Sequence, residues 1–266
     1  MHDLPPSPEF RSAIVTGSTS GIGLAVARAL AEAGHAVMLN GLGDPTAIEN
    51  ARAEMERETG APVAFHGADM SDPAQIADLV AATQARFGRI DIVVNNAGIQ
   101  TVAPIEEFPV DRYNLIVAIN MSAAWHLCRA TFGGMKERGW GRVINVASAH
   151  GLVASPYKSA YVMAKHAVVG LTKTLALEGA EHGITANAIC PGYVLTPLVE
   201  KQIPETAAAR GITEDEVIRD VLLTAQPTRS FVQPGQIGAL AAFLCTPAAS
   251  QITGAALPVD GGWTAH

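Results

Sequence analysis

The stretch TGSTSGIG at residues 16–23 decides the fold. It lies between a short apolar run, SAIVT, and a helical pattern that ends at Gly34. Its glycines, Gly17, Gly21 and Gly23, allow a tight turn and let the backbone approach a pyrophosphate at the start of a helix. A glycine-rich turn alone often only connects two elements. A strand before it and a helix after it favour a dinucleotide-binding turn.

The same rhythm, an apolar run followed by a helical pattern, continues along the chain. Strands this apolar are typical of a parallel sheet covered by helices on both faces. We therefore expect an α/β fold, a single doubly wound (Rossmann) parallel sheet of about seven strands flanked by helices, in one domain over residues 1–266. The expected strands are 12–16, 35–40, 62–67, 90–96, 141–148, 184–190 and 255–260. The expected helices are 23–34, 45–59, 73–87, 110–138, 155–181 and 234–245.

One segment, residues 195–228, breaks this rhythm. It is helical in composition but stands between a strand and a helix, outside the repeating unit. We predict that it forms a helical substrate lid over the crevice at the carboxyl ends of the strands, where such sheets bind ligands.

The composition argues against several classes of protein. The chain has 266 residues, 48% of them hydrophobic, and a net charge of −7 without a basic stripe, so nucleic acid is not an expected partner. Three cysteines without metal-ligand spacing predict buried thiols in a reducing cytoplasm and no metal site. Residues 1–10 lack the apolar region of a secretory signal, and no stretch approaches the length of a membrane span. We expect a cytoplasmic protein.

Further motifs follow the glycine-rich turn in a fixed order. NNAG stands at residues 95–98, Asn120 in the next helix, Ser148 at the end of a strand, Tyr161-x-x-x-Lys165 after it, and PG at residues 191–192. With the G-x-x-x-G-x-G spacing of the first turn, this set resembles the short-chain dehydrogenase/reductase family over nearly the whole chain. The resemblance implies a nicotinamide-dependent oxidoreductase with Asn120, Ser148, Tyr161 and Lys165 as catalytic residues.

The chemistry of Tyr161 and Lys165 supports the same roles. Four residues apart on a helix, their side chains share one face and can meet. A phenol with a pKa near ~10 is a poor base at neutral pH, but a neighbouring ammonium and an oxidised nicotinamide favour the phenolate. Ser148 would hydrogen-bond the reacting oxygen. The resemblance implies that Asn120 supports Lys165 through an ordered water. Without the other motifs, Tyr161 and Lys165 would be interpreted as a tyrosine and a lysine on the surface of an amphipathic helix.

The end of the second strand predicts which cofactor is used. A 2′-phosphate needs a nearby arginine or lysine, and neither residues 16–23 nor NGLGD at residues 40–44 contain one. NAD is therefore favoured over NADP, although Asp44 comes late for an acid that binds the ribose. Leu42 would cover the adenine, with Asp69 and Met70 at its edge. The residues expected to bind the cofactor are Gly17, Thr19, Gly21, Ile22, Gly23, Leu42, Asp69, Met70, Asn96, Ala97, Gly98, Tyr161, Lys165, Pro191, Gly192, Val194 and Thr196.

Two more basic side chains accompany the catalytic set. Ser155-Pro156 is a good helix start, so Lys158 would lie on the helical face of Tyr161 and Lys165. His150 follows Ser148 by two residues. Two potential cations near a reacting alcohol indicate an anionic substrate, most simply a carboxylate. The alternative is a solvated Lys158 and a His150 that packs under the loop.

A second resemblance favours the carboxylate. SAHGLVASPYKSAY, ITANAICPGYVLTPLVEKQI and GIQ resemble the D-3-hydroxybutyrate dehydrogenases within the family, which implies NAD-dependent, reversible oxidation of (R)-3-hydroxybutyrate to acetoacetate and a homotetramer. It departs at Tyr193, where those enzymes usually carry tryptophan. The alternatives are an NADPH-dependent reductase of 3-oxoacyl thioesters or other ketones, and a non-catalytic NAD-binding protein. The implied substrate-binding residues are Gln100, Ser148, His150, Lys158, Tyr161, Tyr193, Gln202 and Trp263.

Overall fold

The computed structural model describes residues 11–265, so the expectation for the first ten residues lies outside the described part of the chain. Its core is a seven-stranded parallel sheet with the order β3-β2-β1-β4-β5-β6-β7, which confirms the doubly wound sheet. The order reverses direction between β1 and β4, and ligands of such sheets bind at the crevice there. The strands are β1 Ser12–Val15, β2 Ala36–Asn40, β3 Val63–His66, β4 Ile92–Asn95, β5 Gly141–Val146, β6 Ile184–Pro191 and β7 Ala256–Val259.

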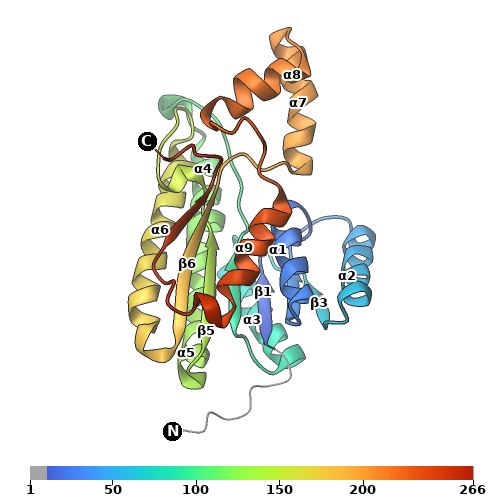
Figure 1. The fold of residues 1–266 in the computed structure, drawn as a ribbon, viewed down its shortest axis with the longest axis vertical. Coiled ribbons are helices and arrows are strands. Elements are labelled where there is room, and N and C mark those ends of the chain that lie inside the picture. Colours follow the sequence, from blue (N-terminus) through green and yellow to red (C-terminus); the bar gives the residue numbers. More distant parts are fainter. Residues whose placement is uncertain (1–10, 266) are drawn as a thin grey trace.

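Helices cover both faces of this sheet (Figure 1). On one face, Val26 and Leu30 pack with Ile237 and Leu244. On the other, a second apolar cluster joins Leu79, Leu127 and Leu175. The helices are α1 Gly21–Glu32, α2 Pro45–Thr59, α3 Pro73–Phe87, α4 Val110–Val117, α5 Ala123–Arg138, α6 Ser159–Gly179, α7 Pro197–Arg210, α8 Glu214–Glu216 and α9 Pro234–Leu244.

A π-helical turn, Ala118–Ser122, joins α4 to α5 without a break, so the predicted helix 110–138 is confirmed as one helical stretch. This stretch, Val110–Arg138, is long and apolar enough to span a membrane by length and composition, with a mean hydropathy of 1.2. The expectation that no stretch approaches a membrane span is wrong on this measure. Leu127, Phe132 and Met135 belong to the cluster beneath the sheet, and a buried core helix passes the same test.

The start of α6 differs from the prediction. The helix begins at Ser159, not at Ser155 with Pro156 in its first turn, and Lys158 is its N-cap. Tyr157 has a φ of 64°, a left-handed conformation that ends any helix before it, and its carbonyl accepts a 2.9 Å hydrogen bond from the backbone N–H of Ala103. This long-range bond holds residues 155–158 in a turn.

The segment predicted as a lid leaves the sheet after β6. Figure 1 shows α7 and α8 beyond the end of the sheet at which β6 finishes. The helices there have a small apolar cluster of their own, in which Ile203, Ala207 and Val217 are buried against Phe231. The segment therefore packs largely against itself.

Candidate active site

The glycine-rich turn has the geometry that its sequence predicts. Gly17 and Gly21 have φ values of 61° and 55°, in the left-handed region that favours glycine. A Cβ at Gly23 would collide with the Gly17 carbonyl oxygen and lie 2.5 Å from Asn96 Nδ2. The turn thus brings backbone to the N-terminus of α1 with no side chain in the way, which fits the pyrophosphate of a dinucleotide.

The loop after β4 is bound to this turn. The hydroxyl of Thr16 accepts 3.0 Å hydrogen bonds from the backbone N–H groups of Asn96 and Ala97. Asn96 Nδ2 donates to the carbonyls of Thr16 and Gly17, at 2.9 Å each. A Cβ on Gly21 would lie 3.3 Å from Thr196 Cγ2, so the segment after β6 meets the same turn. Three predicted cofactor segments therefore converge at the carboxyl edge of the sheet.

The end of β2 presents little charge to this crevice. Leu42 is 68% exposed, and the hydroxyl of Thr19 donates to its carbonyl at 3.3 Å. The Asp44 carboxylate caps α2 by accepting a 2.8 Å hydrogen bond from the backbone N–H of Ala47. Asp69 likewise accepts from Ser71, and Met70 is buried. The late position of Asp44 is therefore explained by a helix cap.

The remaining predicted cofactor residues lie at three places. Ile22 and Val194 pack against the apolar cluster of α1 and α9, and Gly98 lies beside Asn120. Pro191 ends β6, and Gly192 continues the ladder by donating a 3.0 Å hydrogen bond to the Val259 carbonyl. All of them border the converging segments.

Ser148, Tyr161 and Lys165 meet where β5 ends and α6 begins. The pKa of Tyr161 is raised by burial and lowered in part by a hydrogen bond with Ser148. Burial lowers the pKa of Lys165 to about 8. Its ammonium lies 5.6 Å from the centre of the Tyr161 ring and donates a 2.7 Å hydrogen bond to the Val146 carbonyl. The expected lowering of the tyrosine pKa therefore depends on added positive charge, because burial acts in the opposite direction.

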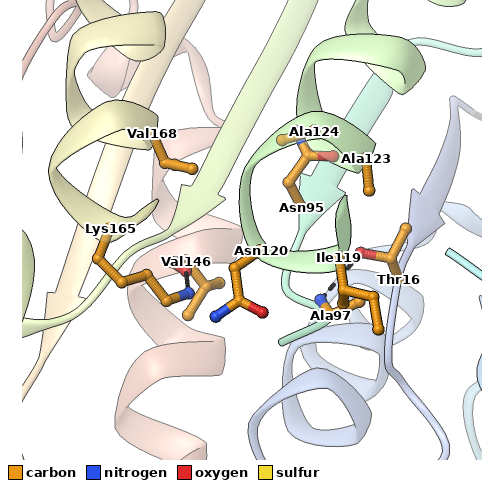
Figure 2. A pocket seen from close by; sticks show the side chains of 10 residues that line it. All are labelled: Thr16, Asn95, Ala97, Ile119, Asn120, Ala123, Ala124, Val146, Lys165 and Val168. Carbon is orange, nitrogen blue, oxygen red and sulfur yellow. Dashed lines mark hydrogen bonds between the residues drawn. The ribbon is translucent and has the colours of Figure 1, made fainter. Parts of the chain in front are cut away.

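Asn120 lies in the π-helical turn, and its side chain is occupied on both sides. Nδ2 donates to the carbonyl of Ile99, and Oδ1 accepts from the backbone N–H of Ile99, both at 2.9 Å. Between Asn120 and Lys165 is a cavity of about 10 Å³, which is close to the space that one water needs (Figure 2). The amide of Asn120 itself holds the loop that follows the NNAG motif.

An aromatic stack continues from Tyr161 to Lys158. The His150 ring meets Tyr161 and Trp263 edge-on, with centroids 6.0 and 5.0 Å apart. Trp263 stacks on Tyr193, with centroids 5.7 Å apart and planes at 6°. The ammonium of Lys158 lies 5.8 Å from the centre of the Tyr193 ring. The two rings of Tyr193 and Trp263 therefore lie between Lys158 and His150.

The charge of His150 differs from the expectation of two cations. Burial, together with the neighbouring Lys158 and His166, lowers the pKa of His150 to about 4, so this ring is neutral at pH 7. Its Nε2 is 2.8 Å from the hydroxyl of Ser155. Burial lowers the pKa of Lys158, and among residues 11–265 no carboxylate lies within 4.0 Å of its ammonium.

The two predicted glutamines are less well placed. Gln100 and Gln202 have exposed side chains, and neither forms a side-chain hydrogen bond with another residue of the described chain. The sequence does not predict two contacts found near these residues. Ser155, whose hydroxyl lies 2.8 Å from His150 Nε2, has the sequence context of a helix cap, and the fully buried Gln226 lies outside every motif. The three cysteines are buried, as predicted. Within residues 11–265, no group of histidine, cysteine and acidic side chains could hold a metal ion.

A doubly wound sheet, a glycine-rich turn at its switch point and a serine, tyrosine and lysine beside it define an oxidoreductase that uses a nicotinamide dinucleotide. A family model described as "Enoyl-(Acyl carrier protein) reductase" matches residues 17–264. The chain belongs to the short-chain dehydrogenase/reductase family, as its motifs predicted.

Similar proteins match over nearly their whole length. The D-beta-hydroxybutyrate dehydrogenase of Rhizobium meliloti (strain 1021) is 55% identical, covering 96% of this chain and 99% of that protein. The protein of the same name from Cupriavidus necator is 54% identical, covering 96% and 98%. The crystal structure of a variant actinorhodin polyketide ketoreductase with NADPH is 34% identical, with a TM-score of 0.89, covering 97% and 98%.

Proposed function

We propose that the protein catalyses the reversible, NAD-dependent oxidation of (R)-3-hydroxybutyrate to acetoacetate. The observation that carries this proposal is Lys158, a half-buried ammonium without a carboxylate partner in the described chain, which lies over the Tyr193 ring and near His150, the ring that meets Tyr161. A carboxylate is the ligand that such a cation favours. The names of the two bacterial dehydrogenases support the choice of a short 3-hydroxy acid.

In this proposal Tyr161 takes the proton of the substrate hydroxyl group, and Ser148 donates a hydrogen bond to the same oxygen. NAD, held by the glycine-rich turn and the segments that converge on it, would supply the acceptor for the hydride of the carbon that carries this oxygen. The Lys165 ammonium, 5.6 Å from the tyrosine ring, stabilises the phenolate that must exist before the proton moves. Support of Lys165 through a water is a further proposal, and the small cavity beside Asn120 supports it. In the reverse direction Tyr161 donates the proton.

Substrate binding is assigned to the far side of the pocket. Lys158 pairs with the carboxylate, while His150 contributes a hydrogen bond as a neutral ring, its Nε2 being placed against Ser155. Tyr193 and Trp263 form the apolar wall. Residues 195–228 form the lid, and its exposed Gln202 reaches the carboxylate only when the lid closes.

Replacing Lys158 by methionine is expected to raise the KM for 3-hydroxybutyrate about 10- to 150-fold, because a hydrogen bond to a charged group contributes about 1.5–3 kcal/mol. The Kd for NADH should stay unchanged, since Lys158 lies outside the segments that bind the cofactor. Lys173→Met is the matched control, an exposed lysine on the same helix. If Lys158→Met and the control Lys173→Met have the same KM, the substrate carboxylate does not bind at Lys158.

The use of NADP by a ketone reductase is the competing proposal, and the polyketide ketoreductase structure with NADPH gives it support. Residues 16–23 and 40–44 offer no basic side chain to a 2′-phosphate, and Leu42 is exposed there. We therefore expect NADH to bind at least about 10-fold more tightly than NADPH in a fluorescence titration. Tighter binding of NADPH would favour the competing function.

A further inference from the structure

Three separate segments meet at the base of the lid: residues 192–195, 226–232 and 260–264. The Leu195 N–H donates to the Val232 carbonyl and the Val232 N–H to the Tyr193 carbonyl, both at 2.9 Å, so the two ends of the lid are paired. The Thr228 N–H donates to the Gly261 carbonyl at 3.1 Å. The base therefore connects the lid to both loops that carry the aromatic wall.

Gln226 lies at the centre of this base and is fully buried. Its Oε1 accepts a hydrogen bond from the backbone N–H of Tyr193, and its Nε2 donates a 2.7 Å hydrogen bond to the Ser230 carbonyl. A Cβ at Gly192 would collide with Gln226 Oε1, and one at Gly261 would lie 3.4 Å from Gln226 Nε2. Two glycines thus leave the room that this one side chain occupies.

The atoms that Gln226 holds are those of the aromatic wall. Its bond to the Tyr193 N–H fixes the backbone of the residue whose ring stacks on Trp263 and faces the Lys158 ammonium. The turn that carries Trp263 is fixed separately, because the Asp260 carboxylate accepts hydrogen bonds from the N–H groups of Gly262 and Thr264, at 3.0 and 2.9 Å. The relative position of the two rings therefore depends on two bonds to the Tyr193 backbone, one from the Val232 N–H and one to the only side chain involved, that of Gln226.

We propose that Gln226 is a positioning residue of the substrate pocket, which ties the exit of the lid to Tyr193 and so keeps Tyr193 stacked between Lys158 and Trp263. The consequence for the hydroxy acid rests on the function proposed above. The role of Gln226 in holding Tyr193 against Trp263 does not rest on that function, because the two rings stack in the protein alone. Gln226 does not touch the reacting atoms, and its only contacts with a predicted cofactor segment are with the backbone at Gly192 and Tyr193.

Gln226→Leu removes both hydrogen bonds and keeps a buried side chain of similar size. We expect the KM for (R)-3-hydroxybutyrate to rise at least about 10-fold, and the NADH Kd to rise by a clearly smaller factor because Gln226 borders the cofactor segment only at Gly192 and Tyr193. Gln236→Ala is the matched control, since this exposed glutamine caps α9 through the Gln233 N–H, away from the pocket. It should leave both constants unchanged. A general loss of structure in Gln226→Leu would instead weaken NADH binding by a factor as large as the rise in KM.

A second measurement needs no turnover. The emission of Trp263 is obtained by subtracting the emission of the same protein with Trp263→Phe. Its quenching by acrylamide should be stronger in Gln226→Leu than in wild type, because the Trp263 ring loses its stacking partner. In an active enzyme, an unchanged KM or unchanged quenching overturns the proposal. If wild-type protein does not oxidise 3-hydroxybutyrate, the proposed function fails, and the quenching result alone decides the role of Gln226.

Gln226→Glu is the second variant if the leucine variant does not fold. A protonated glutamic acid can both donate to the Ser230 carbonyl and accept from the Tyr193 N–H, but its carboxylate cannot donate. At acidic pH we expect the KM of Gln226→Glu to be close to that of wild type. As the pH increases, the ratio of the variant's KM to the wild-type KM should rise. A ratio that does not change with pH would contradict the proposal.

Discussion

Tyr161→Phe is expected to lower kcat about 10²- to 10⁴-fold, the usual contribution of a general acid or base. Phenylalanine keeps the ring that meets His150 edge-on but cannot take the proton of the substrate hydroxyl. Stopped-flow or steady-state reduction of NAD measures the loss. The Kd for NADH should stay within about 2-fold of wild type, because the hydroxyl group is a small part of the cofactor site.

Tyr113→Phe is the control for this variant. Tyr113 is 40% exposed on α4, and its hydroxyl has no place in the proposed reaction, so kcat should not change. Retained turnover in Tyr161→Phe would remove the proposed proton acceptor. Tight NADH binding by wild-type protein with no turnover of any hydroxy acid would favour the non-catalytic alternative.

Lys165→Met is expected to lower kcat by a similar factor, about 10²- to 10⁴-fold, while costing little stability. The buried ammonium has its pKa lowered to about 8 from the ordinary 10.5, a penalty of about 3 kcal/mol at neutral pH. Methionine removes this penalty but leaves the Val146 carbonyl without its donor, at a cost of about 1–3 kcal/mol. The two effects nearly cancel, so urea unfolding at pH 7 should resemble that of wild type.

The pH dependence of stability tests the same group. Because the folded-state pKa of Lys165 lies below its unfolded value, the unfolded chain binds more protons between pH 8 and 10.5. The contribution of Lys165 to the free energy of unfolding therefore becomes more favourable as the pH rises through that window. Lys165→Met should lack this gain. Parallel pH profiles for the two proteins would show that Lys165 is not buried as described.

The fold could be predicted from the sequence because most residues of the strands are apolar and the strands before the last alternate with helical patterns. The structure shows why the predicted bounds of α2 and α3 hold: Asp44 and Asp72 cap the two helices ahead of a proline, and the left-handed Gly60 and Gly88 end them. The residues at the ends of a helix or strand were enough to predict its bounds wherever no hydrogen bond from a distant part of the chain intervened.

The site was predicted less completely than the fold, as Lys158, His150 and Gln226 show. Lys158 does reach the aromatic wall, but as an N-cap next to a left-handed Tyr157, not through helical periodicity. His150 is neutral because of burial and a neighbouring charge, which a sequence does not display. Gln226 bonds to a backbone 33 residues away and belongs to no motif. Contacts of this kind are decided by packing.

The reduction of NAD by each enantiomer of 3-hydroxybutyrate, followed by absorbance and repeated with NADP, tests the central proposal most directly. We predict rapid reduction of NAD by the R enantiomer, little by the S enantiomer, and little reduction of NADP with either. No reduction of NAD by the R enantiomer, with folded protein that binds NADH, would contradict the proposed substrate while leaving the family assignment in place.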